Sequence, residues 1–325
     1  MVARAPALLR AVAVNIARLL GVLLLVSVLA FLALRLTPGD PAQLMIGPQA
    51  GSADVAQRLE QLRVDMGLDQ PLPVQYGRWI GRLASGEFGE SNRSGVPVLT
   101  LIGDAAPVTA WLVGLSVLVS VPLSIVLGML AAAFHRRLPD RAIRLFLTLG
   151  LTTPAFWLGI ILLNVFAVSM GWFPTSGYVS PLADPGGFLS HMALPVLALS
   201  LFLTGTLARY VYAEATEVLA QDYIRTARAM GIPERQVLLR FAARNALIPL
   251  IAVTGVQLAA LVGGAVLVEQ VFGLPGVGQL MLTGVLGRDY QIVQGAVMIA
   301  TCAVLVITTL ADVAYRVVDP RLKVA

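Results

Sequence analysis

Six long apolar stretches dominate this sequence and limit what it can fold into. A helix needs about 20 mostly apolar residues to cross the hydrocarbon core of a bilayer. The stretches lie near Val12–Leu34, Pro107–Phe134, Leu145–Met170, Met192–Ala208, Ala246–Val268 and Ile292–Leu310. The second and the third contain no charged residue. We therefore expect an all-α membrane protein with six transmembrane helices.

Composition supports a membrane environment and argues against a soluble domain. The chain is 58% hydrophobic and 13% charged, whereas a soluble domain is roughly 45–50% apolar and about 25% charged. The net charge of +5 alone would allow nucleic-acid binding. The charged residues lie mainly in the segments between the apolar stretches, however, so membrane lipid is the expected partner and nucleic acid is not.

Four prolines fall inside the apolar stretches: Pro122, Pro154, Pro195 and Pro249. In a membrane bundle, neighbouring helices can satisfy the carbonyl groups that a proline leaves free. We expect these prolines to produce kinks that serve helix packing. The first stretch could instead be a signal peptide, but its apolar run is longer than the usual 7–15 residues and no cleavage site follows it, so we expect a retained helix.

Metal-binding and catalytic motifs are missing from the sequence. Cys302 is the single cysteine, and the two histidines, His135 and His191, lie far apart in different segments. Neither a disulfide within the chain nor a metal site is expected. No carboxylate pair, histidine cluster or activated nucleophile is recognisable, so we assign no catalytic residue.

The basic residues predict how the helices are oriented. Of the 23 arginines and lysines, 16 lie on one side of the expected membrane, and of the two short loops on the other side only one holds a basic residue, Arg288. Because cytoplasmic loops are enriched in basic residues, both termini are expected in the cytoplasm. The expected organisation is a first helix in 1–34, an external segment over 35–106, and a core over 107–325 with a cytoplasmic loop at 209–244.

The long external segment contains one predicted amphipathic helix. Asp54 and Gln57 fit a reciprocal helix cap. Apolar residues follow at helical spacing, namely Val55, Leu59, Leu62 and Met66. A helix packed on the outer mouth is one reading and a docking surface for an external partner is another, and the two are compatible.

The cytoplasmic loop reads as a helix, a glycine turn and a second helix. Asp222 suits a helix start, Gly231 suits a left-handed cap, and Pro233 suits the start of the next helix. Tyr223, Ala227 and Met230 share one face at helical spacing, while Arg225 and Arg228 face elsewhere. Periodicity alone leaves two readings open for the first helix: insertion into a protein groove, or binding to anionic lipid.

Tyr223-Ile-Arg-Thr-Ala-Arg-Ala-Met-Gly231, continued by Arg244-Asn-Ala-Leu-Ile-Pro249, resembles the coupling (EAA) loop of ABC importer permeases. Further stretches resemble the B-type subunit of the dipeptide/oligopeptide/nickel branch. They are Leu36-Thr-Pro-Gly-Asp-Pro41, Gly67-Leu-Asp-Gln-Pro-Leu72, Gly86-Glu-Phe-Gly-Glu-Ser-Asn92, Pro174-Thr-Ser-Gly-Tyr178 and Val268-Glu-Gln-Val-Phe-Gly-Leu-Pro-Gly-Val-Gly278. The resemblance covers nearly the whole chain. The loop departs from the family at Met230, where lysine is common, and at Pro233, where a hydroxyl residue is common, so the fit to a particular ATPase is in question.

The resemblance implies a multi-pass permease of the bacterial inner membrane that forms half of an import pathway for di- or oligopeptides. The implied partners are a second homologous permease, two ATPase subunits and an external substrate-binding protein. This chain has no phosphate-binding G-x-x-x-x-G-K-[S/T] loop. It is therefore expected to bind no cofactor, with ATP and Mg held by the ATPases.

The resemblance also implies roles for individual residues. Coupling to the ATPase is assigned to Tyr223, Arg225, Thr226, Ala227, Arg228, Ala229, Gly231 and Glu234. Docking of the binding protein, or an external gate, is assigned to Glu269, Phe272, Gly273, Pro275, Gly276 and Gly278, although a plain re-entrant turn fits the same segment. Asn164, Thr204 and Gln257 are candidates for lining the passage, or alternatively for joining helices.

Other functions are compatible with parts of the sequence. A permease of the same family could carry nickel or another small solute. An ion-driven secondary carrier belongs to a different class, but such carriers place ionisable groups near the middle of the membrane. Here Glu269 and Asp312 lie at the ends of the expected spans, which argues against a carrier, and a membrane enzyme is disfavoured by the lack of a catalytic constellation.

Overall fold

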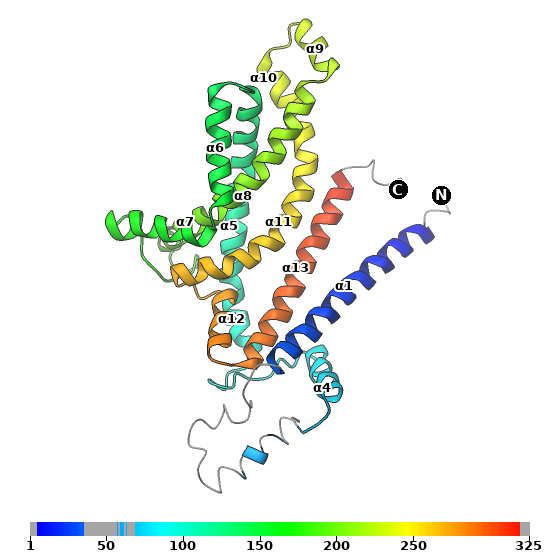
Figure 1. Ribbon diagram of the computed structural model, residues 1–325, viewed down its shortest axis with the longest axis vertical. Coiled ribbons are helices and arrows are strands. Elements are labelled where there is room, and N and C mark those ends of the chain that lie inside the picture. Colours follow the sequence, from blue (N-terminus) through cyan, green and yellow to red (C-terminus); the bar gives the residue numbers. More distant parts are fainter. Residues whose placement is uncertain (1–4, 36–56, 58, 62, 64–68, 319–325) are drawn as a thin grey trace. The chain divides into compact units, whose positions relative to one another are not determined.

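The computed structural model describes residues 5–35, 57, 59–61, 63 and 69–318 (Figure 1). The described elements are α1 (Ala5–Arg35), α4 (Leu72–Ala84), α5 (Val98–Ala133), α6 (Leu138–Thr152), α7 (Ala155–Leu162), η2 (Leu163–Ser169), α8 (Pro185–Leu219), α9 (Asp222–Ala229), α10 (Glu234–Gln236), η3 (Val237–Ala242), α11 (Ala243–Phe272), α12 (Val277–Leu286) and α13 (Tyr290–Val318), where η marks a π-helix. Over these residues the chain forms no strand, and a single β-bridge joins Glu90 to Pro97. The all-α prediction is confirmed for this part of the chain.

Several of these helices are long and apolar enough to cross a membrane. Within the described residues, four qualify, over Val98–Ala133, Pro185–Leu219, Val253–Phe272 and Tyr290–Val313. A bent pair formed by α6 with α7 and η2 would make a fifth. The described apolar part of α1, Ala17–Ala33, is shorter. The structure therefore supports a helical membrane protein.

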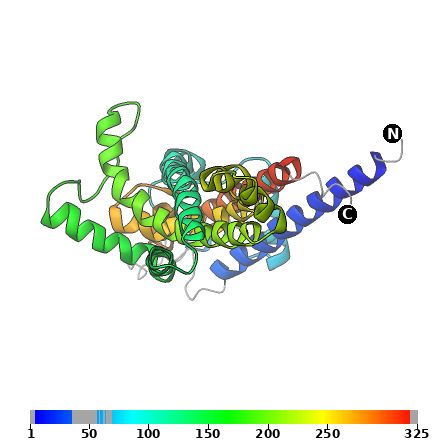
Figure 2. The same ribbon diagram turned by 90° about the horizontal axis from the view of Figure 1, so that it is seen from above.

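The third expected stretch is not one helix. α6 ends at Thr152, α7 begins at Ala155, and the two directions differ by 103°. Proline restricts the residue before it to extended geometry, and Thr153 has φ −84° and ψ 124°. Pro154 thus breaks the helix instead of kinking it gently as predicted, whereas Pro122 and Pro195 lie inside continuous helices. Both views show α7 projecting sideways from α5, α6 and α8 (Figures 1 and 2).

The chain divides into two compact units, Met1–Asp104 with Leu280–Leu305 and Ala105–Gln279 with Val306–Ala325. In the larger unit α8 is the central helix, packing against α6, α7, α11 and η3. Its buried side chains include Met192, Leu199, Leu203 and Leu207. α8 is also much longer at both ends than the expected 192–208. Asp184 caps its start by accepting a hydrogen bond from the backbone N–H of Gly186 at 3.0 Å.

Small residues form one buried stripe along α5. Ser116, Ser120, Ser124 and Gly128 recur every four residues and all are buried. Ser120 Oγ donates to the Ser200 carbonyl of α8 at 3.1 Å, and a Cβ on Gly128 would lie 2.8 Å from the Ala208 carbonyl oxygen. Small residues of this kind allow membrane helices to approach closely. This stripe, a seam of small residues between α5 and α8, was not predicted from the sequence.

The smaller unit is held by an aromatic cluster between α1 and α4. Phe31, Tyr76 and Trp79 lie with ring centroids 5.5–6.0 Å apart, and the hydroxyl groups of Ser27 and Tyr76 are 2.7 Å apart. α4 is a helix that the sequence analysis did not predict. The amphipathic helix predicted from Asp54 to Met66 falls mostly outside the described residues.

Candidate functional site

The loop between α8 and α11 follows the predicted order of helix, turn and helix. α9 begins at Asp222 and ends at Ala229, and Pro233 precedes α10. α10 then continues through η3 directly into α11. η3 thus forms the junction between this loop and the long helix that follows. π-helical segments are rare and frequently occur at functional sites.

One face of α9 is fixed to the rest of the unit. Ile224 is fully buried and Ala227 is 4% exposed, and α9 packs against η3, whose Val237 is also fully buried. The Tyr223 ring lies 6.3 Å from the Phe241 ring, centroid to centroid. The packed face is therefore centred on Ile224 and Ala227. Of the three residues expected to share one face, only Ala227 belongs to it, since Tyr223 and Met230 are exposed.

The opposite face of α9 is open to solvent and carries most of the residues assigned to coupling. Arg225, Thr226, Arg228 and Ala229 are exposed. Met230 is 70% exposed directly after the helix. A short helix that is anchored by two buried side chains and exposes both charged and apolar groups can bind a partner without losing its own position.

Arg228 and Glu234 form the strongest polar contact of this loop. Arg228 Nε donates to one carboxylate oxygen of Glu234 at 3.0 Å, and its Nη2 donates to the other oxygen at 2.7 Å. Hydrogen bonding to Arg228 lowers the pKa of Glu234, although partial burial opposes this, and the same pairing raises the pKa of Arg228. The pair joins α9 to α10 across the turn, so these two residues hold the loop together.

Gly231 occupies the turn between the two helices. Its φ of 81° lies in the left-handed region, where residues with a Cβ atom are strained. A Cβ atom at this position would meet nothing within 4 Å. A larger residue is therefore disfavoured by backbone conformation and not by space.

The other end of α11 has a different character. Glu269 is fully buried. One carboxylate oxygen accepts a hydrogen bond from Thr109 Oγ1 of α5 at 2.6 Å, and the other accepts from the Gln279 backbone N–H in the first turn of α12 at 3.0 Å. Thr109 Oγ1 also accepts from the backbone N–H of Val277 at 2.9 Å. The carboxylate thus lies at a helix N-terminus, where negative charge is stabilised.

Two glycines leave the space that this carboxylate needs. A Cβ atom on Gly276 would overlap the Glu269 carboxyl group, and one on Gly278 would lie 2.5 Å from the Cα of Val266. Phe272 is 2% exposed, Gly273 is half-buried with a left-handed φ of 58°, and Pro275 is exposed. Of the six residues assigned to docking or gating, four are buried, namely Glu269, Phe272, Gly276 and Gly278.

The three proposed lining residues lie in different settings. Asn164 is exposed, and its amide nitrogen donates to the Ile160 carbonyl of the same helical segment at 3.0 Å. Thr204 is fully buried in α8, and its hydroxyl group forms no hydrogen bond with the residues that the structure describes. Gln257 is partly buried. Burial of Thr204 favours the helix-packing alternative for that residue.

Sequence reasoning missed the residues that hold these sites in place. Ile224 was detectable, because it lies three residues before Ala227 and the two share a helical face. Thr109 gave no local signal, since it pairs with a residue 160 positions away. Across the described residues no group of three His, Cys, Asp or Glu side chains could hold a metal ion.

Comparison with family models matches two parts of the chain. Residues 124–324 match the model described as binding-protein-dependent transport system inner membrane component. Residues 8–113 match the model for the N-terminal part of such membrane components. Together the two matches include α1, the coupling-loop region and both ends of α11.

Curated proteins of similar length resemble this chain from end to end. A putative peptide transport system permease protein of Brucella abortus (strain 2308) is 40% identical over 309 residues, which is 95% of this chain and 97% of that protein. The glutathione transport system permease protein GsiC of Salmonella paratyphi A is 38% identical over 309 residues, covering 94% and 97%. The protein of the same name from Escherichia coli O1:K1 / APEC is 38% identical over 311 residues, covering 95% and 98%.

Proposed function

Because this chain belongs to the family of inner membrane components of binding-protein-dependent transport systems, we propose that it imports di- and oligopeptides as one half of an ABC transporter's passage. It is a multi-pass permease of the bacterial inner membrane. Relatives that share about 40% of its residues over nearly the whole length are named for peptide and glutathione transport. Those names support a peptide substrate over nickel, the alternative within the same family.

Six membrane crossings with both termini in the cytoplasm are the proposed topology. The four long apolar helices, the bent pair and α1 supply the segments, and the basic residues supply the direction. Impermeant thiol labelling of cysteines introduced at Glu60 and Arg235, with Cys302 replaced by serine, tests it. Labelling from outside at position 60 but not at position 235 is expected, and the reverse pattern would overturn the proposed orientation.

We propose that α9 is the helix that an ATPase subunit grips. The observation that carries this proposal is the combination of a fixed face, Ile224 and Ala227, with an exposed face on a helix that connects through η3 to α11. A displacement of α9 would then reach α11 through packed side chains and continuous backbone. Such coupling needs an element with two arrangements that both partners bias, and α11 is the proposed element.

The proposed assembly contains this chain, a second homologous permease, two ATPases and an external binding protein. ATP and Mg would be held by the ATPases, and this chain would perform no catalysis. The binding protein would contact the external side, where Pro275 is the exposed member of its segment. Glu269, Phe272, Gly276 and Gly278 would act there indirectly, by fixing the shape of the segment.

The decisive experiment measures whether uptake needs ATP. The complex that co-purifies with this chain is reconstituted in proteoliposomes, and uptake of labelled di- and oligopeptides is measured with ATP and with a non-hydrolysable analogue. Peptide uptake is expected with ATP and not with the non-hydrolysable analogue. Peptide uptake that persists without any ATPase chain, driven by a proton or sodium gradient, would identify a secondary carrier and refute the proposal.

A further inference from the structure

The turn between α5 and α6, together with the first turn of α6, exposes three arginines. Arg136, Arg137 and Arg141 are all exposed. Among the ion pairs formed by the described residues, none includes these three guanidinium groups, whereas Arg144, one turn further along α6, is paired with Asp140. Three neighbouring positive charges that form no ion pair with the described residues exert a strong local attraction on an anion.

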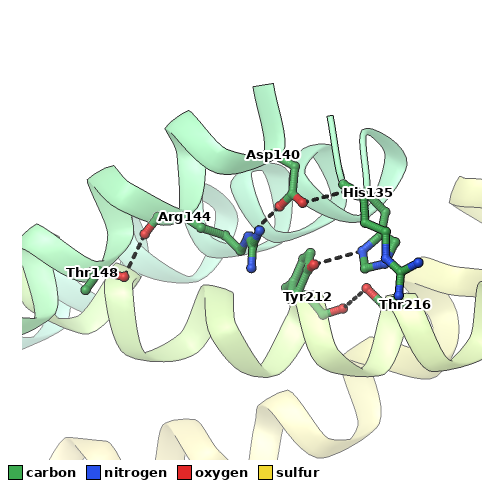
Figure 3. Close-up of polar contacts among 7 residues, drawn as sticks. His135, Asp140, Arg144, Thr148, Tyr212 and Thr216 are labelled. Atoms are coloured by element: carbon green, nitrogen blue, oxygen red, sulfur yellow. Dashed lines mark hydrogen bonds and ion pairs between the residues drawn. The ribbon is translucent and has the colours of Figure 1, made fainter. Parts of the chain in front are cut away.

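A polar network around the buried Asp140 carboxylate fixes the backbone of this turn (Figure 3). Asp140 is fully buried; one carboxylate oxygen accepts from the Arg136 backbone N–H at 2.8 Å, and the other lies 2.7 Å from Arg144 Nε. The Arg144 guanidinium group lies over the Tyr212 ring of α8 at 5.5 Å, and Tyr212 Oη lies 2.8 Å from His135 Nδ1. Arg144 is thereby directed toward α8, and Arg136 is held at a left-handed φ of 64°.

Apolar side chains lie next to the three arginines. Phe134 directly follows α5 and is 38% exposed, and Leu138, the first residue of α6, is 77% exposed. Leu145, Phe146 and Leu149 continue the exposed apolar surface along α6. Water is an unfavourable neighbour for such side chains, whereas acyl chains are a favourable one.

The length of an uncharged run places the turn near the surface of the bilayer. The run covers residues 105–135, and its 31 residues at about 1.5 Å each extend about 46 Å as a helix. A bilayer is about 40–45 Å thick including its headgroups. Between Asp104 and Arg136 the sequence holds no Asp, Glu, Lys or Arg. The arginines therefore follow directly on the membrane-crossing run, at the level expected for phosphate groups.

We propose that Arg136, Arg137 and Arg141 bind the phosphate of an anionic phospholipid whose acyl chains lie along Leu138 and the exposed apolar side chains of α6. The planar guanidinium group donates two parallel hydrogen bonds to a phosphate. The fixed turn presents the three groups together, which lowers the entropy cost of binding. This inference is independent of the substrate and of the ATPase.

A lipid fits this surface better than a soluble protein does. An acidic groove on a protein would match the arginines but would leave Leu138, Leu145 and Phe146 against a polar surface. A phospholipid matches both halves, because its charge and its apolar chains are joined in the same order as the arginines and the apolar side chains.

Native mass spectrometry of the purified full chain tests the proposal. The protein is incorporated into nanodiscs of phosphatidylcholine and phosphatidylglycerol, released, and assayed for retained lipid. Each arginine near a membrane surface contributes about 1 kcal/mol, a factor of about five. Replacing Arg136, Arg137 and Arg141 with glutamine together is expected to reduce retained phosphatidylglycerol about a hundredfold, and each single replacement about fivefold, with phosphatidylcholine unchanged.

Matched variants separate this site from general charge. Replacing Arg235, Arg240 and Arg244, which are also exposed, with glutamine removes the same charge elsewhere and is expected to leave lipid retention unchanged. The triple lysine variant at the site is expected to retain at least half of the wild-type phosphatidylglycerol and to melt like wild type. Soluble glycerol phosphate at equal concentration is expected not to compete.

Three outcomes would overturn the proposal. Unchanged retention in the single glutamine variants would show that the arginines do not hold the lipid. Equal loss in the Arg235, Arg240 and Arg244 variant would show a nonspecific effect of charge. Cross-linking of a cysteine at position 137 to an ATPase subunit, with no lipid retained, would assign the surface to that protein.

Discussion

The two ends of α11 look alike in the sequence and differ in the structure. Each carries at least one glycine, a proline and an acidic residue, and each was assigned to contact with a partner. At the start of α11, the α9 loop exposes its charged groups and pairs them at the surface. At the end, Glu269 is buried and its two carboxylate oxygens accept hydrogen bonds from α5 and α12. The first end therefore exposes its charged side chains, and the second end buries its carboxylate group.

The largest effect is expected from Glu269→Ala. This change leaves the Thr109 hydroxyl and the Gln279 N–H without their acceptor in a buried site. Losing a hydrogen bond to a charged group costs about 1.5–3 kcal/mol, so we expect a loss of about 2–4 kcal/mol, measured as a lower thermal midpoint in detergent. Gln270→Ala, at the exposed neighbouring position, is the control and is expected to be neutral. Equal midpoints for both variants would contradict the distinction between the two ends.

Gly276→Ala is expected to have the next largest effect. The new methyl group overlaps the Glu269 carboxyl group, and overpacking of this kind costs typically 1–3 kcal/mol. Pro275→Ala, one residue earlier on the exposed side, is expected to leave the free energy of unfolding within about 0.5 kcal/mol of wild type. If Pro275→Ala destabilised the protein more, the buried role of the segment would be wrong.

Glu234→Gln is expected to change global stability little, because exposed ion pairs contribute about 0–1 kcal/mol. The bidentate pair with Arg228 nevertheless joins α9 to α10, so we expect faster proteolysis of the loop and about a twofold loss in the peptide transported per ATP. Asp222→Asn removes the longer pair with Arg225, at 3.4 Å, and should have no measurable effect. A larger decrease in the thermal midpoint for Glu234→Gln than for Glu269→Ala would reverse the comparison.

The smallest effect concerns pH. Hydrogen bonding to Arg228 lowers the pKa of Glu234, so the pair is fully formed above the usual glutamate pKa of about 4.3. Its contribution is lost only as the pH falls through the lowered value in the folded protein. Hydrogen exchange of α9 should therefore be independent of pH between 6 and 8 after correction for the intrinsic rate. A protection step in that range that disappears in Glu234→Gln would contradict this assignment.

Local patterns predicted the local structure well. The helix beginning at Asp222, the left-handed Gly231 and the restart after Pro233 all follow from neighbouring residues, and the structure confirms them. The break at Pro154 was underestimated, because the sequence does not indicate which prolines a bundle will accommodate. The kink expected there is a bend of 103°.

Contacts between distant segments could not be predicted in the same way. The partner of Glu269 is a threonine on α5, and the seam of Ser116, Ser120 and Ser124 acquires meaning only when α8 lies against it. The Glu269 contact and the serine seam depend on which helices pack together, and apolar periodicity does not predict which helices these are. A glycine-rich segment with one acidic residue can therefore be either a surface for partners or the cover of a buried carboxylate.

The coupling ratio of Gly231→Val tests the central claim most directly. Valine is β-branched and strongly disfavoured at a φ of 81°, so the turn that fixes α9 relative to α10 should be disturbed while the helices still insert. Peptide uptake and ATP hydrolysis are measured together in the reconstituted complex. We predict continued hydrolysis with uptake reduced at least tenfold. Normal uptake per ATP hydrolysed in this variant would show that α9 is not the coupling element.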